Sequence, residues 1–94
     1  MDIEKLEMFV RAARLKNITD AAQSLQYTQS GASHMLQALE QELGGIELLA
    51  RSRKGVELTA AGQRLLPLAQ EILYWNGQLM QTAAVLQGNE TGLL

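Results

Sequence analysis

Apolar residues recur at intervals of three and four positions near the start of the chain, which predicts an amphipathic helix over residues 3–15. The apolar face of this helix consists of Leu6, Phe9, Val10 and Ala13. The polar run KNIT at 16–19 interrupts the period, and either Asn17 or Thr19 can cap the next helix. We expect that second helix to be short, over about 19–26, with two alanines that let another helix approach closely.

A third amphipathic segment follows a tight turn, and Thr28 is the residue expected to cap it. Its apolar positions are spaced four, three and four residues apart and are Ala32, Leu36, Leu39 and Leu43. Glycines at 44 and 45 end this helix. Two short helices joined by a tight turn, with small residues on the first, form the helix-turn-helix pattern.

Two short apolar runs come next, IELLA at 46–50 and VEL at 56–58, and they predict two strands around the polar turn RSRKG. This stretch holds three of the eight cationic residues of the chain, Arg51, Arg53 and Lys54. A strand, a basic turn and a second strand after a helix-turn-helix predict a wing. The expected fold class is therefore mainly α, a winged helix-turn-helix of three helices and a two-stranded wing over 1–58.

A single long linker helix is predicted over 59–88, capped by Thr59. Seven of its positions alternate at spacings of four and three and form a heptad seam: Leu65, Ala69, Ile72, Asn76, Leu79, Ala83 and Leu86. Such a seam predicts dimerisation, with Asn76 either setting the register between two copies or lying on the rim. Trp75 is expected in an interface, and residues 89–94 are expected to form a tail.

The net charge of −2 counts against a nucleic-acid partner, but the charges are unevenly distributed. Besides the wing cluster, Arg11, Arg14 and Lys16 crowd the end of the first helix. A dipolar surface can bind DNA despite a negative total. With 47% hydrophobic and 19% charged residues, the chain of 94 residues is expected to be one small ordered domain or a fragment of a longer chain.

Other classes of protein are disfavoured by what the sequence lacks. The absence of cysteine excludes disulfides and thiolate metal sites, and the single histidine has no partners for a metal. No carboxylate lies within helical reach of Ser33 and His34 and no phosphate loop occurs, so no enzyme, cofactor or metal is expected. No apolar run approaches the roughly 20 residues that span a bilayer, and no signal-peptide layout is present, so we expect a cytoplasmic protein without membrane contact.

The third helix carries no positive side chain, because no lysine or arginine occurs between Lys16 and Arg51. Backbone amides at its start can hold a phosphate, and Gln29 can pair bidentately with adenine. A polar helix face and a basic turn are also commonly just solvated, and Arg51 can instead pair with Glu40. From these residues alone, both interpretations stay open.

The chain resembles the N-terminal part of LysR-type transcriptional regulators over about residues 3–87. The ordered positions that carry the resemblance are Leu6, Phe9, Ala21, Ala22, Thr28, Gln29, Ser33, Leu39, Glu40, Leu43, Gly44, Arg51, Leu58, Thr59 and Gly62. The molybdate-responsive regulators, which have a related N-terminal domain, are a weaker match. The chain departs from the usual pattern at Ser30, commonly proline, at His34, commonly arginine, and at Leu49, usually phenylalanine and here preceded by one extra glycine.

The resemblance implies a bacterial regulator that binds sequence-specifically to double-stranded operator or promoter DNA. The third helix would enter the major groove, and the wing would lie on the backbone or minor groove. Gln29, Ser30 and His34 would face bases, with Thr28 and Ser33 nearer phosphates. The residues expected to contact DNA are Thr19, Thr28, Gln29, Ser30, Ser33, His34, Gln37, Arg51, Arg53 and Lys54.

The resemblance also implies a homodimer, or a tetramer of the full-length protein, and a small-molecule effector bound only by a C-terminal domain beyond residue 94. One alternative stays open. The acidic balance and the neutral third helix also fit a winged-helix interaction module that has lost DNA binding and serves assembly through the long helix.

Overall fold

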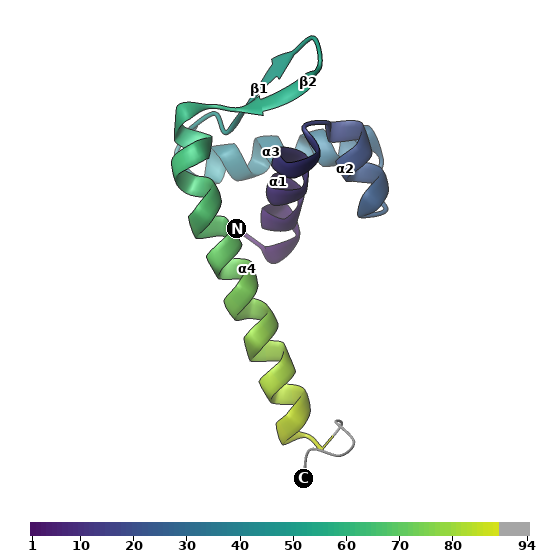
Figure 1. The fold of residues 1–94 in the computed structure, drawn as a ribbon, viewed down its shortest axis with the longest axis vertical. Coiled ribbons are helices and arrows are strands. Elements are labelled where there is room, and N and C mark those ends of the chain that lie inside the picture. The colour runs from purple at the N-terminus through teal and green to yellow at the C-terminus, as the bar shows by residue number, and fades with distance from the viewer. Residues whose placement is uncertain (89–94) are drawn as a thin grey trace.

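The structure is a computed structural model that describes residues 1–88 of the chain (Figure 1). Its elements, in order, are α1 (Ile3–Leu15), α2 (Ile18–Ser24), α3 (Gln29–Glu42), β1 (Leu49–Ser52), β2 (Gly55–Leu58) and α4 (Ala60–Leu86). The first three helices pack together, the hairpin of β1 and β2 lies beside them, and α4 extends away as a long arm (Figure 1). The expected fold class is confirmed. The tail expected at 89–94 lies outside the described residues.

Each helix begins at a polar side chain that accepts a hydrogen bond from the backbone of its own first turn. Asn17 Oδ1 accepts from Asp20 N at 2.8 Å, so Asn17, and not Thr19, caps α2. The helix consequently starts at Ile18, one residue earlier than expected. Thr28 caps α3 as predicted, with its Oγ1 3.0 Å from the backbone nitrogen three residues further on.

The core lies where the three short helices meet. Met8 and Phe9 of α1 and Leu39 of α3 are fully buried, together with Leu48 from the segment before β1. The two alanines of α2 are also buried, and their small side chains let α1 and α3 pack closely on either side. The two predicted short helices are therefore held at a fixed angle by one shared apolar core.

The strands β1 and β2 pair antiparallel and form the wing. The position predicted for the first strand, 46–50, is wrong, because β1 begins at Leu49. Both backbone groups of Leu48 are engaged elsewhere: its N donates to Glu40 Oε2 at 2.8 Å, and its carbonyl oxygen accepts from Thr59 N at 3.0 Å. Since neither group of Leu48 is left for the ladder, the strand starts at Leu49, three residues later than predicted.

The first half of α4 packs on the domain, and the second half leaves it (Figure 1). Ala69 is 5% exposed, and Leu65 packs against the core of the chain itself. The predicted heptad seam is uncovered only from Ile72 onward, where Leu79 is 67% and Leu86 is 82% exposed. Within residues 1–88, no helix combines the length and the hydropathy needed to cross a membrane.

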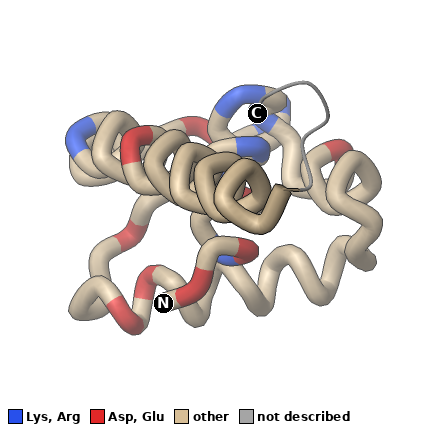
Figure 2. Tube along the Cα trace, turned by 90° about the horizontal axis from the view of Figure 1, so that it is seen from below, with Lys and Arg blue, Asp and Glu red and all other residues tan. Residues whose placement is uncertain are grey.

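Charge is distributed unevenly over this architecture. Lys5 Nζ lies 2.6 Å from Glu42 Oε2, and the Met1 amino group lies 3.2 Å from Glu42 Oε1, so an ionic cluster joins the start of α1 to the end of α3. In Figure 2, acidic segments gather around the N-terminus, and the last part of α4 is uniformly uncharged. No charged residue occurs in 72–88.

Candidate nucleic-acid interface

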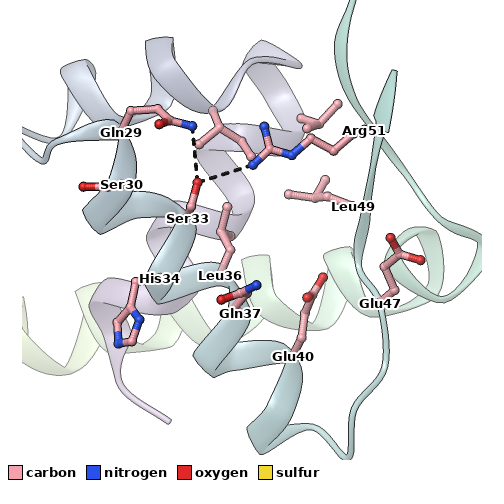
Figure 3. A pocket seen from close by; sticks show the side chains of 12 residues that line it. Gln29, Ser30, Ser33, His34, Leu36, Gln37, Glu40, Glu47, Leu49 and Arg51 are labelled. Atoms are coloured by element: carbon pink, nitrogen blue, oxygen red, sulfur yellow. Dashed lines mark hydrogen bonds between the residues drawn. The ribbon is translucent and has the colours of Figure 1, made fainter. Parts of the chain in front are cut away.

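The outer face of α3 carries most of the polar residues that the sequence singled out. Gln29, Ser30, His34 and Gln37 are exposed, and Ser33 is half-buried. In Figure 3, Ser33 points toward the wing, whereas Ser30 and His34 point away from it. The helix therefore presents two chemically different edges, one shared with the wing and one open.

A hollow of about 550 Å³ separates α3 from the wing (Figure 3). Buried Leu36 and Leu49 contribute to its lining, beside the polar groups of α3. Ser33 Oγ lies 3.4 Å from Gln29 Nε2 and 3.5 Å from Arg51 Nη2. Both distances are long for hydrogen bonds, so these contacts are weak, and an external acceptor can readily replace Ser33.

The interpretation in which Arg51 pairs with Glu40 is wrong. One carboxylate oxygen of Glu40 accepts the backbone N–H of Leu48, and Arg51 reaches Ser33 instead. Within residues 1–88, none of the three wing cations takes part in an ion pair. Cations without a carboxylate partner can form charge-assisted hydrogen bonds to an incoming anion.

A second hollow of about 290 Å³ lies between the start of α2, the start of α3 and the wing. The predicted residues that line it are Thr19, Gln29, Arg51, Arg53 and Lys54. The structure therefore brings residues from α2, α3, β1 and the turn of the wing to one concave surface. Asn17 and Ser52 also line it. Sequence reasoning assigned Asn17 only as a cap, and nothing in the sequence distinguished Ser52.

The N-terminus of α3 opens toward this surface. Thr28 Oγ1 accepts the N–H of Gly31, while the preceding amides of Gln29 and Ser30 lie in the first turn, where no carbonyl of the helix can accept from them. The positive end of the helix dipole adds to their attraction for an anion. A Cβ at Gly31 would lie 3.0 Å from Thr28 Oγ1, so glycine also keeps the cap compact.

The opposite end of α3 is acidic. Glu40 and Glu47 line the far part of the larger hollow, and sequence reasoning missed Glu47, which lies in a segment predicted as a strand. Beyond them, the hydrogen bond from Lys5 lowers the pKa of Glu42, with a further contribution from the Met1 amino group. The same bond raises the pKa of Lys5. An anionic ligand is therefore favoured at the N-terminal half of α3 and at the wing.

Comparison with known proteins places this geometry in a family. The family described as bacterial regulatory helix-turn-helix proteins of the lysR family matches residues 3–63, from α1 to the first turn of α4. The chain belongs to the LysR family. It is 37% identical over 91 residues to the HTH-type transcriptional regulator HdfR of Escherichia coli, covering 96% of this chain and 32% of that protein. The chain thus spans about a third of the length of the curated relatives it matches.

Solved structures of LysR-family proteins have the same fold. The CbnR DNA-binding domain, solved in a complex with DNA, is 36% identical and superposes with a TM-score of 0.84, covering 93% of this chain and 99% of that one. The BenM DNA-binding domain, solved with benA site 1 DNA, is 30% identical with a TM-score of 0.83, covering 92% of this chain and 99% of that one. Vibrio fischeri DarR, also solved with DNA, is 27% identical with a TM-score of 0.87, covering 94% of this chain and 30% of that one.

This LysR-family chain keeps the core and changes the surface where it departs from the usual pattern. Leu49, in place of phenylalanine, is 9% exposed and still packs in the core. Ser30 and His34 both lie on the open edge of α3 (Figure 3). Among residues 1–88, no cluster of histidine, aspartate or glutamate side chains has the geometry to hold a metal ion.

Proposed function

We propose that this LysR-family chain binds double-stranded DNA sequence-specifically, as the DNA-binding part of a bacterial transcriptional regulator. The observation that carries the proposal is the single concave surface formed by the exposed polar face of α3 and the unpaired cations of the wing. α3 enters the major groove, whose width admits one helix. The wing lies against the backbone or the minor groove.

Affinity and specificity reside on different elements. The cations of the wing neutralise phosphates and release counterions, which supplies most of the binding free energy. Gln29, Ser30 and His34 face base edges, and Gln29 can pair bidentately with adenine. Thr28, Ser33 and the amides at the start of α3 hold a phosphate and fix the register. A recognition helix without lysine or arginine is consistent with this division.

The active species is a homodimer held together through α4. The part of the heptad seam that extends beyond the domain, Ile72, Asn76, Leu79, Ala83 and Leu86, lies in a stretch of helix without a single charge (Figure 2). Ile72, Leu79 and Leu86 are exposed, and Asn76 and Ala83 are half-buried. An apolar seam of this length is covered most readily by the same seam of a second copy. Two copies bring six wing cations to the duplex, for a salt slope of about −5 at −0.9 for each phosphate.

The full-length regulator acts in the cytoplasm, where it has access to the chromosome, and it is not an enzyme. Its additional domain binds a small-molecule effector and adds contacts for a tetramer. The relatives matched here are about three times longer than this chain, which leaves room for such a domain.

The test is selection of duplexes from a random pool, followed by fluorescence anisotropy at about 50 and about 200 mM salt. We expect enrichment of a two-fold symmetric sequence and a Kd below about 1 μM at the lower salt concentration. Affinity should fall steeply at the higher concentration. If no duplex is enriched, or if binding is independent of salt, the proposal fails, and the assembly-module interpretation takes its place.

A further inference from the structure

The chain contains one histidine, and it lies on the face of α3 assigned to the bases. His34 is exposed and points away from the wing (Figure 3). A shallow hollow of about 390 Å³ surrounds it, and every residue that lines this hollow belongs to α3: His34, Gln37, Ala38, Glu40 and Gln41. His34 also lines the larger hollow toward the wing, and within residues 1–88 no side chain hydrogen-bonds to the imidazole.

The charged groups around His34 are few. On its own helix, Glu40 shares the hollow, and one of its carboxylate oxygens is occupied by the N–H of Leu48. Across the larger hollow, the segment before β1 contributes Glu47 and β1 contributes Arg51, while α2 contributes only an apolar side chain. Within residues 1–88, the His34 side chain makes no hydrogen bond and no ion pair.

Protonation changes what this side chain can recognise. A neutral imidazole offers one donor and one acceptor, whereas a protonated imidazole offers two donors and a positive charge. The guanine edge in the major groove presents only acceptors, N7 and O6, and phosphates surround the groove. A duplex therefore binds the protonated form more tightly than the neutral form. The arginine that is common at this position supplies the same donors at every pH.

We propose that His34 is a specificity-determining residue that reads guanine when protonated and thereby makes DNA binding by this chain depend on pH. The inference rests on the proposed function. Imidazole is the side chain whose charge ordinarily changes between about pH 5 and 8, and no cysteine or second histidine competes in this chain. The Met1 amino group lies against Glu42 at the opposite end of α3, away from His34. Lower pH therefore tightens binding and shifts base preference toward guanine.

The experiment compares the wild-type chain with His34→Gln and His34→Arg on a selected duplex, at about pH 6 and about pH 8 and constant ionic strength. We expect the wild-type Kd to be lower at about pH 6 by roughly three- to tenfold for each protomer. His34→Gln, which is polar but does not titrate, should lose this dependence. His34→Arg should bind tightly at both values. An equal pH dependence in wild type and His34→Gln would overturn the inference.

Selection of duplexes at the two pH values tests the base assignment. For the wild-type chain, guanine should be enriched at one position of each half-site at about pH 6 and lose that enrichment at about pH 8, while His34→Gln should select the same sequences at both. Unchanged wild-type selection would overturn the assignment. Because residue 34 is exposed and glutamine and arginine are good helix formers, both variants should melt like the wild type. Failure of every variant to bind any duplex would instead refute the proposed function.

Discussion

Gly55 lies directly against the backbone of Lys16, where α1 ends. The backbone nitrogen of Val56 donates to the carbonyl oxygen of Lys16 at 3.1 Å, and a Cβ on Gly55 would lie 2.0 Å from that same oxygen. Lys16 itself has a left-handed conformation, with φ of 57°, which turns its carbonyl toward β2. Because Gly55 pairs with Ser52 beside the turn of the hairpin, this contact anchors the turn end of the wing to the helical core and so sets where the wing cations lie relative to α3.

Gly55→Ala should therefore displace the wing. The new Cβ collides with backbone that cannot yield easily, and the φ of +131° at this position disfavours any side chain. We expect a loss of roughly 2 kcal/mol in the free energy of unfolding and a weaker, less salt-dependent affinity for DNA. Urea unfolding and anisotropy titration measure the two effects. Gly77→Ala is the matched control, since a Cβ there meets nothing within 4 Å, and it should leave stability equal or slightly higher.

Gln29→Ala and Arg53→Ala should affect DNA binding in different ways. Removing the amide of Gln29 should flatten base preference by about 1–3 kcal/mol at one position, with little change in binding to random duplex. Removing the Arg53 guanidinium should weaken binding to all duplexes and make the salt slope of the dimer shallower by about two, one for each protomer. Competition titrations with specific and random duplex at several salt concentrations measure both. If the two variants lose specific and non-specific binding in the same proportion, affinity and specificity do not reside on separate elements.

The features predicted well from the sequence are those decided within a few residues. The cap at Thr28 depends on a side chain and a backbone amide that are three positions apart. The helix-turn-helix depends on the spacing of apolar residues within one short segment of the chain. The start of β1 was missed because distant groups decide it. Glu40 and Thr59 take the backbone groups of Leu48, and no local pattern shows that residues eight and eleven positions away will do so.

The same distinction applies to the candidate site. Polar residue types on α3 and in the wing left a DNA-binding face and a solvated face equally open, and only the family resemblance selected the expected contact residues. Their periodicity did not show that Arg51 would reach Ser33 and not Glu40, since that choice depends on how the wing packs. Nor did the heptad seam show where the domain would cover it. That Ala69 is covered and Leu79 is not follows only from the tertiary packing of α4.

The ion pair between Lys5 and Glu42 predicts a dependence of stability on acid. The Lys5 hydrogen bond lowers the pKa of Glu42 from its ordinary value of 4.5, so the folded state binds that proton less readily than the unfolded state. The stabilisation is present when the pH is above the pKa of Glu42 in the unfolded state. It is lost as the pH falls through the lower pKa that Glu42 has in the folded state. Urea unfolding of wild type and Glu42→Gln should give curves that differ near neutral pH and converge below about pH 4. A difference that persists unchanged in acid would show that Glu42 acts through packing instead.

Leu79→Asp should prevent dimerisation through α4. Leu79 is 67% exposed in the single chain, so a carboxylate there costs the monomer little, yet it would be buried against the second copy. We expect a monomer by sedimentation equilibrium and a loss of affinity for a full palindromic site, while binding to a half-site stays near the wild-type value. Gln81→Asp is the matched control, because it adds the same charge to an exposed position on the opposite side of the helix.

The fluorescence of Trp75, the only tryptophan, provides a second measurement of dimerisation through α4. It is 61% exposed in the single chain and stacks edge-on against Tyr74, with ring centroids 5.0 Å apart. Burial against a second copy should shift its fluorescence to shorter wavelength as protein concentration rises, in the wild type and in Gln81→Asp but not in Leu79→Asp. A wild-type chain whose emission is independent of concentration and whose sedimentation is that of a monomer would rule out the α4 dimer. The affinity of the wing and α3 for a half-site would then have to account for operator binding alone.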